Sequence, residues 1–296
     1  MAVPDPIRKQ QQAESLAAVL PPLLVAAERV ASTVAQGVHG RRRVGTGDSF
    51  WQFRRYHAGD QIQAIDWRQT GKRQAVFVRE QEWEASQSVW LWRDGTPSMA
   101  YRSATALPTK RERAEILLLA LASLLNRAGE RIALLGGDAP PASGRANLAR
   151  LATMLERQPA AAPRPEQLPR HAELVLIGDF LAPLAETEQI VNACAGRAVR
   201  GHLLQVLDPA EATLPFGGRI RFSGMEGEQD TLVPRVETIR DAYLERLRLQ
   251  QEGLAALARS AGWTFAVHRT DRPPQTALLA LYGALAEVPL PTAREG

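Results

Sequence analysis

Cysteine is nearly missing from this chain, since its 296 residues include one, Cys194. A single cysteine cannot form an intramolecular disulfide, which is typical of proteins in a reducing compartment. Long apolar runs are missing too. The longest, residues 116–125, has ten residues, whereas a membrane-spanning helix needs about 20. No basic stretch followed by an apolar stretch and a cleavage site opens the sequence. We therefore expect a soluble, cytoplasmic protein with no membrane span.

The usual signatures of enzymes are also absent. The five histidines show no metal-ligand spacing, and no Gly-x-Ser-x-Gly nucleophile elbow occurs. A phosphatase of the haloacid dehalogenase type needs a second aspartate two positions after the first, to act as general acid and base. Here Asp94 is followed by Thr96. We predict that the protein is not an enzyme, and a metal-dependent phosphohydrolase is kept as an alternative.

Apolar residues at 45% and charged residues at 23% indicate an ordinary globular protein with a net charge of +4. The charge is unevenly distributed, because residues 41–80 hold nine Lys or Arg residues and four Asp or Glu residues. Aromatic residues lie among these arginines and could stack on bases. A nucleic-acid-binding module is therefore a second alternative. A solvated arginine-rich surface is the commoner explanation, and we expect no nucleic-acid partner.

Apolar runs alternate with helical patterns along most of the chain. Continuous apolar runs are typical of strands buried on both faces of a parallel sheet. Alternating strands and helices predict an α/β fold with a doubly wound, mostly parallel sheet and right-handed crossovers. The predicted strands are 75–84, 89–92, 131–135, 173–178, 201–207 and 263–268; the predicted helices are 110–127, 147–157, 185–194, 236–260 and 276–286, with a hairpin near 215–232 and helices within 1–36.

Oxygen-bearing side chains follow the strand at 89–92 at every second position: Asp94, Thr96 and Ser98. A turn at the carboxyl end of a strand can direct all three to one point. One carboxylate and two hydroxyls are hard donors, which suit Mg²⁺ or Mn²⁺ with water in the remaining positions. A plain Asp-Gly turn explains the same residues without a metal. Asp179 ends the predicted strand 173–178, and the carboxyl ends of parallel strands gather ligands.

The first loop resembles the metal-dependent adhesion site of von Willebrand factor A domains, Asp-x-Ser-x-Ser. A longer series resembles the domain of unknown function 58 family, which carries this signature ahead of such a domain. The series is Gly45-x-Gly47-x-x-Phe50, Arg55-Tyr56-x-x-Gly59-Asp60, Ile65-Asp66-Trp67-Arg68 and Val78-Arg79-Glu80, followed by the Asp94 motif. The resemblance implies a von Willebrand factor A fold and places Asp179 in the site as its third-loop carboxylate. Such domains also use a second-loop threonine, but residues 136–145 hold only Ser143 as a hydroxyl.

These patterns predict an N-terminal helical segment (1–39), a signature segment with a strand (40–84) and a von Willebrand factor A-like domain (85–290). The expected function is non-catalytic, metal-dependent protein interaction. The expected site holds Mg²⁺ or Mn²⁺ through Asp94, Thr96, Ser98 and Asp179. The family resemblance also implies a partnership with a MoxR-type AAA+ ATPase, in chaperone-like assembly or maturation of a client protein.

Overall fold

The computed structural model describes residues 31, 49–55, 71, 76–82, 88–157 and 162–286. The chain divides into two compact units, residues 39–87 and the remainder. Apart from Ala31, the predicted N-terminal helices lie outside the described residues. The same is true of the signature residues Gly45, Gly47, Asp60, Asp66 and Trp67.

The smaller unit contains an antiparallel pair of strands, β1 (Ser49–Arg55) and β2 (Phe77–Glu82). The register places Ser49 opposite Glu82 and is shifted between Phe50 and Gln52. The second strand confirms the prediction for 75–84. The first was not predicted, because adjacent aromatic residues break the alternation that marks a strand, and the register shift falls at that point.

The larger unit is built on five parallel strands in the order β4–β3–β5–β6–β9. This arrangement confirms the predicted parallel, doubly wound sheet. An isolated antiparallel bridge between Ile132 and Ala142 is the one departure from parallel pairing among the described residues of this sheet. The strands are β3 (Ser88–Arg93), β4 (Arg131–Leu134), β5 (Glu173–Gly178), β6 (Arg200–Leu207) and β9 (Thr264–Arg269).

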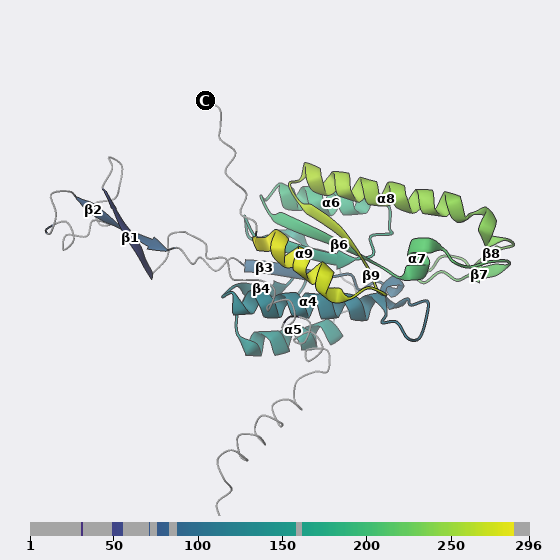
Figure 1. Ribbon diagram of the computed structural model, residues 1–296, viewed down its shortest axis with the longest axis horizontal. Helices are drawn as coiled ribbons and strands as arrows, with labels where there is room; N and C mark the ends of the chain where they lie inside the picture. Colours follow the sequence, from purple (N-terminus) through teal and green to yellow (C-terminus); the bar gives the residue numbers. More distant parts are fainter. Residues whose placement is uncertain are drawn as a thin grey trace, which may run out of the picture. The chain divides into compact units, whose positions relative to one another are not determined.

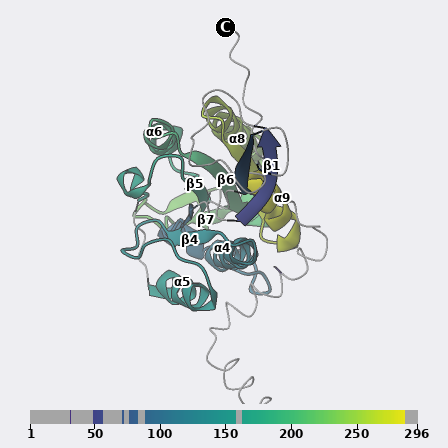
Figure 2. The ribbon, with the colours of Figure 1, turned by 90° about the vertical axis from the view of Figure 1, so that its left-hand side faces the viewer.

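Helices cover both faces of this sheet (Figures 1 and 2). Side chains along each strand alternate between the two layers: Val89 and Leu91 pack in one apolar cluster, and Trp90 packs in the other. Burial on both faces explains why these strands read as continuous apolar runs. One face carries α4 (Lys110–Arg127), α5 (Arg145–Arg157) and α9 (Pro274–Ala286), and the other carries α6 (Leu184–Ala195) and α8 (Arg240–Ser260).

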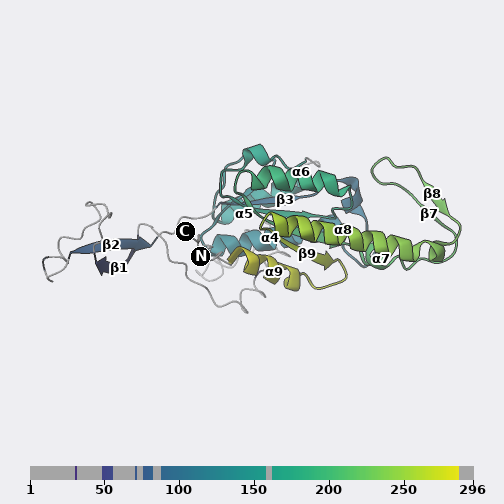
Figure 3. The same cartoon turned by 90° about the horizontal axis from the view of Figure 1, so that it is seen from above.

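Short elements join the main ones beyond the carboxyl end of β6. They are the helix α7 (Pro209–Thr213) and the hairpin of β7 (Ile220–Phe222) and β8 (Thr231–Val233), beside the first turns of α8 (Figure 3). The hairpin confirms the prediction near 215–232. Three 3-10 helices complete the described chain, at Pro97–Ala100 (η2), Pro165–Gln167 (η3) and Val236–Thr238 (η4). Among the described residues, no helix has the length and apolar composition needed to cross a membrane.

Strand order reverses between β3 and β5, which lie side by side at the centre of the sheet. The chain leaves β3 toward β4 on one side and leaves β5 toward β6 on the other. In open α/β sheets the two loops at such a point separate and leave a crevice at the carboxyl ends of the strands. Asp94 and Asp179 directly follow these two strands.

Candidate functional site

The first loop of the site is a tight turn after β3. The backbone N–H of Asp94 donates to the Ile177 carbonyl at 2.8 Å, so the sheet continues up to the loop. Oδ1 of Asp94 accepts a hydrogen bond from the backbone N–H of Thr96 at 2.8 Å. The Thr96 and Ser98 hydroxyl oxygens lie 3.0 Å apart. The alternate spacing thus places these hydroxyls side by side.

The second part of the site comes from the loop after β5. The Ser98 hydroxyl donates to Oδ2 of Asp179 at 2.7 Å, which joins the two loops. The amide of Gln205 donates to the Asp179 carbonyl at 2.7 Å. Asp94 and Asp179 are 9% and 4% exposed. All four residues predicted from the sequence therefore lie at the same edge of the sheet.

Close approach of the two strand ends depends on Gly178. A Cβ atom at this position would lie 2.9 Å from Cβ of Asp94 and 3.2 Å from its Oδ2. Contacts under 3 Å are essentially never seen for a real Cβ, so a larger residue would displace the Asp94 side chain. The glycine at the end of β5 therefore allows the Asp94 carboxyl group to sit beside the Asp179 loop.

Lys110 is a part of the site that the sequence analysis missed. Its side chain is fully buried, and Nζ donates to Asp179 Oδ2 at 2.8 Å and to Glu211 Oε1 at 2.5 Å. Burial alone would lower the pKa of Lys110, but the charges of Asp179 and Glu211 outweigh it and raise the pKa. Lys110 is therefore a fixed internal cation beneath Asp179.

A signal for Lys110 was present in the sequence. Lys110 opens α4, whose N-cap Thr109 forms a capping box with Glu112. A positive charge in the first turn of a helix opposes the helix dipole. Two consecutive cations there, Lys110 and Arg111, indicate that something else holds them. Arg111 lies 3.4 Å and 3.5 Å from the carbonyl oxygens of Gly95 and Thr96.

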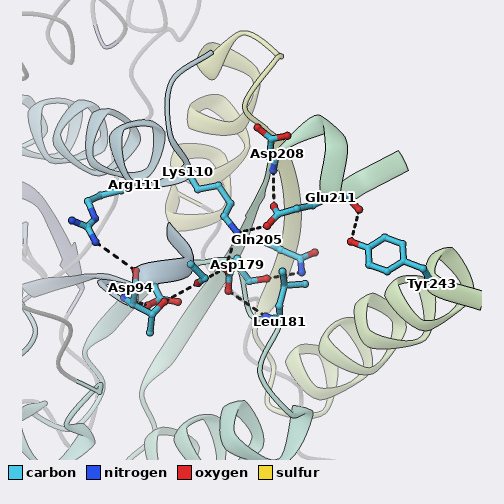
Figure 4. A network of polar contacts seen from close by, with 11 residues as sticks. Asp94, Lys110, Arg111, Asp179, Leu181, Gln205, Asp208, Glu211 and Tyr243 are labelled. Atoms are coloured by element: carbon cyan, nitrogen blue, oxygen red, sulfur yellow. Dashed lines mark hydrogen bonds and ion pairs between the residues drawn. The ribbon is translucent and has the colours of Figure 1, made fainter. Parts of the chain in front are cut away.

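Glu211 is the other partner of Lys110, and α7 holds it in place. Asp208 caps α7, and Glu211 Oε2 accepts the Asp208 backbone N–H at 2.9 Å. The phenol of Tyr243, in α8, donates to the Glu211 carbonyl at 2.7 Å (Figure 4). Asp179, Lys110 and the partly buried Glu211 therefore form a charged series that links the sheet to α7 and α8.

Asp94 is a buried carboxyl group beside a second one, Asp179. Burial raises the pKa of Asp94 above its ordinary value; the N–H of Thr96 opposes this shift, and the nearby charge of Asp179 adds to it. Carboxylate and hydroxyl oxygens are hard donors, so Asp94, Thr96 and Ser98 fit Mg²⁺ or Mn²⁺. Asp179 already accepts from Ser98 and Lys110. It therefore fits the role of positioning Ser98 and adding negative charge.

The donor set is a sparse one. Within the described residues, no group of three or more His, Cys, Asp or Glu side chains is placed to hold a metal ion. Ser143, the hydroxyl considered for the second loop, is exposed and is not among the residues lining the site cavity. Ala162 and Pro163 are among the residues that do line the cavity. A metal here would depend on Asp94, two hydroxyls and water.

The loop after Asp179 is held in an uncommon backbone conformation. Phe180 has a φ of 48°, in the left-handed region that bulky residues rarely adopt. The Gln250 amide, from α8, donates to the carbonyls of Phe180 and Ala182 at 3.0 Å each. These bonds fix the loop and help to place the Phe180 ring in the wall of a cavity.

That cavity, of about 880 Å³, opens at the site. Asp94, Thr96, Ser98 and Asp179 line one part of it. The β5–α6 loop, α7 and the β7–β8 hairpin line much of the rest. Its size is within the range of ligand pockets, roughly 300–1,000 Å³. The site residues are thus accessible to a binding partner.

The sequence matches a known family over more than half of its length. The family is described as "Protein of unknown function DUF58", and the match covers residues 52–253. The chain is 26% identical over 290 residues to the uncharacterized proteins Mb1516 of Mycobacterium bovis and Rv1480 of Mycobacterium tuberculosis. These alignments cover 91% of this chain and 89% of each relative.

The solved structures that match this chain include two from Bacteroides. One is the conserved hypothetical protein BatB of Bacteroides thetaiotaomicron, with a TM-score of 0.40, 13% identity, and coverage of 68% of this chain and 100% of that one. The other is an aerotolerance-related membrane protein of Bacteroides fragilis, with a TM-score of 0.40, 15% identity, and coverage of 67% and 98%.

Proposed function

The chain belongs to the DUF58 family, and from that premise we propose that it is a non-catalytic protein-interaction module whose binding depends on a divalent metal. The observation that carries the proposal is the convergence of Asp94, Thr96 and Ser98 with Asp179. Two hydroxyls lie 3.0 Å apart, and one of them bonds to the second carboxylate at 2.7 Å. These groups come from two neighbouring strand ends and line an open cavity.

Asp94, Thr96 and Ser98 would hold Mg²⁺ or Mn²⁺, with Asp179 supporting them. When bound, such a cation supplies an open coordination position that a carboxylate of a partner protein can fill. The chain's own residues do the rest. Lys110 fixes Asp179 at 2.8 Å, and Gly178 leaves the space that Asp94 needs. The site is thus held in place before a partner arrives.

The partner expected from the family resemblance is a MoxR-type AAA+ ATPase. We propose that this chain joins such an ATPase to a client protein during assembly or maturation of the client. A non-catalytic role agrees with the chemistry of the first loop. Thr96 stands where a phosphohydrolase of the haloacid dehalogenase type needs its general acid, and its hydroxyl contacts Ser98. Most of the basic segment 41–80 lies outside the described residues, so the nucleic-acid alternative stays a prediction.

Affinity purification from the native cell tests the proposal. Tagged wild-type protein and Asp94→Ala are compared with Mg²⁺ present and with a chelator. We expect mass spectrometry to identify a MoxR-type AAA+ ATPase with the wild-type protein in Mg²⁺, and in none of the other three conditions. Capture of the same ATPase by Asp94→Ala would refute the metal-dependent mechanism. A salt-sensitive gel shift with nucleic acid would favour the alternative.

A further inference from the structure

The cavity beside the site continues as a groove between the β5–α6 loop and the β7–β8 hairpin. On one side it is lined by Phe180 and Leu181, and on the other by Phe222 and Met225 of the hairpin. Figure 3 shows the hairpin beyond the sheet, next to α7 and the first turns of α8. This part of the cavity is the groove.

Much of the groove wall is apolar and accessible. Leu181 is 41% exposed and Met225 is 42% exposed. Phe216 and Phe222 contact each other edge to face, with ring centroids 6.0 Å apart, and both rings line the groove. Exposed apolar side chains gathered in one place on a globular protein mark a surface that another chain covers.

The charges of the groove have one sign. Among the described residues that line it and the adjoining site, six are acidic and none is Lys, Arg or His. Lys110 lies beneath the site and is already paired with Asp179 and Glu211. Three of the acids, Glu186, Glu226 and Glu228, are exposed at the rim. An apolar wall with an acidic rim selects a positively charged occupant with apolar side chains.

We infer that the groove binds a cationic, apolar segment of a partner protein, in which Lys or Arg residues alternate with aromatic or branched aliphatic residues. The apolar side chains pack against Phe180, Leu181 and Met225. The basic side chains meet the rim acids Glu186, Glu226 and Glu228. A nucleic acid or an anionic lipid surface is negatively charged, as the rim is, and the rim would repel it.

This inference deepens the proposed function, because it rests on the claim that this edge of the sheet binds protein. It does not require the metal. A cation at Asp94 and Asp179 would offset negative charge at the site end of the cavity. The three rim acids would keep their charge. The partner segment would then place one carboxylate at the metal and its basic residues along the groove.

Binding of defined peptides to the full chain tests the inference. The probe is a short fluorescein-labelled peptide that alternates Lys with Leu and Phe, followed by fluorescence anisotropy. In two matched peptides every Lys is replaced by Ser or by Glu. We expect the Lys peptide to bind at least about tenfold more tightly than the Ser peptide, and to weaken as salt is raised. The Glu peptide is expected not to bind in the absence of a divalent cation.

Two triple variants separate a local effect from overall charge. Glu186→Gln, Glu226→Gln and Glu228→Gln together should weaken binding of the Lys peptide about tenfold or more. The control combines Glu188→Gln, Asp230→Asn and Asp241→Asn, which are exposed and do not line the groove. The control also removes three negative charges, but it should leave the affinity for the Lys peptide nearly unchanged.

Leu181→Ser and Met225→Ser test the apolar wall. Each side chain is about two-fifths exposed, so the fold should tolerate these changes while affinity for the Lys peptide falls. Equal binding of all three peptides, or equal losses in the two triple variants, would overturn the inference. This experiment tests the groove independently of the metal, because binding of the Lys peptide should persist with a chelator. Chelator-sensitive capture of the ATPase with no Lys-peptide preference would leave the proposed function standing and remove the groove inference.

Discussion

At the scale of single residues, the buried ammonium of Lys110 is the least replaceable group in the site. It pairs with two carboxylates, Asp179 and Glu211, at 2.8 Å and 2.5 Å, and its side chain has no exposure to solvent. Removing one partner of a buried pair leaves an uncompensated charge. The raised pKa of Lys110 means that its stabilisation is fully present below the ordinary lysine pKa. It is lost only as the pH rises through the raised value.

Lys110→Met is therefore expected to lower the free energy of unfolding at neutral pH by about 3–5 kcal/mol. Denaturant unfolding measures this change. The double variant Lys110→Met with Glu211→Gln removes one of the two stranded carboxylates. It should recover part of the loss. A Lys110→Met protein as stable as the wild type would show that the buried charges are not coupled in this way.

His268 contributes to the pH dependence of stability in acid. It is 4% exposed, and burial, together with the nearby charge of Arg113, lowers its pKa to about 4. In the unfolded chain a histidine titrates near 6.5. The unfolded state therefore binds a proton first as the pH falls, so stability from neutral His268 is lost between about 6.5 and 4.

His268→Gln should flatten this part of the stability curve. The difference between wild type and variant should change by up to about 3 kcal/mol between pH 7 and pH 4. Urea unfolding at several pH values measures it. His171→Asn is the control, because His171 is exposed and has the positive φ that asparagine tolerates. Parallel curves for wild type and His268→Gln would contradict the account.

The sequence predicted some of these residues and missed others for a physical reason. Asp94, Thr96 and Ser98 lie within five residues, so their spacing alone indicates convergence. Lys110 meets Asp179 and Glu211 across 69 and 101 residues of chain. Only the fold brings them together. The unfavourable place of Lys110 in the first turn of α4 indicates that it has a partner, but the local pattern does not show which residues pair with it.

At the scale of elements, Gly178 at the end of β5 leaves the space that the Asp94 side chain occupies. The Cβ atom of an alanine there would press on Asp94 at 2.9 Å. Gly178→Ala should cost about 1–3 kcal/mol of stability by overpacking. It should also weaken metal binding about tenfold by moving the carboxylate. Unfolding and metal titration measure the two effects.

Gly283→Ala in α9 is the matched control. Apart from its chain neighbours and the backbone of its own helix, no heavy atom of the described residues lies within 4 Å of a Cβ built at Gly283. Alanine in place of glycine inside a helix stabilises by about 1 kcal/mol. Metal binding should not change. If Gly178→Ala bound metal as tightly as Gly283→Ala, close approach of the strand ends would not matter to the site.

Strong periodic elements were predictable, and one short helix was not. The predicted helix 110–127 and strand 173–178 agree with α4 and β5 residue by residue, because long apolar patterns record burial. The five-residue helix α7 was missed. It has too few turns to show a helical period. It is specified by the Asp208 and Glu211 capping box, and Glu211 also has the long-range contact with Lys110.

At the scale of the whole molecule, a doubly wound sheet explains where the site lies. Neighbouring strands β3 and β5 send their loops apart, and the two aspartates follow them. This much was predictable from strand and helix alternation. The groove was not, because it depends on how the hairpin, α7 and α8 pack beyond the sheet. Residues 39–87 form a separate compact unit, and the boundaries proposed from the sequence at 40 and 84 stay a prediction.

Titration of the full-length protein with Mn²⁺, followed by electron paramagnetic resonance, tests the central claim most directly. We expect the wild type to bind a single Mn²⁺ that Mg²⁺ displaces, and Asp94→Ala to lose this binding. Without metal, Asp94→Ala should be as stable as the wild type or slightly more so, because a buried carboxylate with a raised pKa is removed from beside Asp179. Equal Mn²⁺ binding by wild type and Asp94→Ala, or no binding by the wild type, would contradict the account.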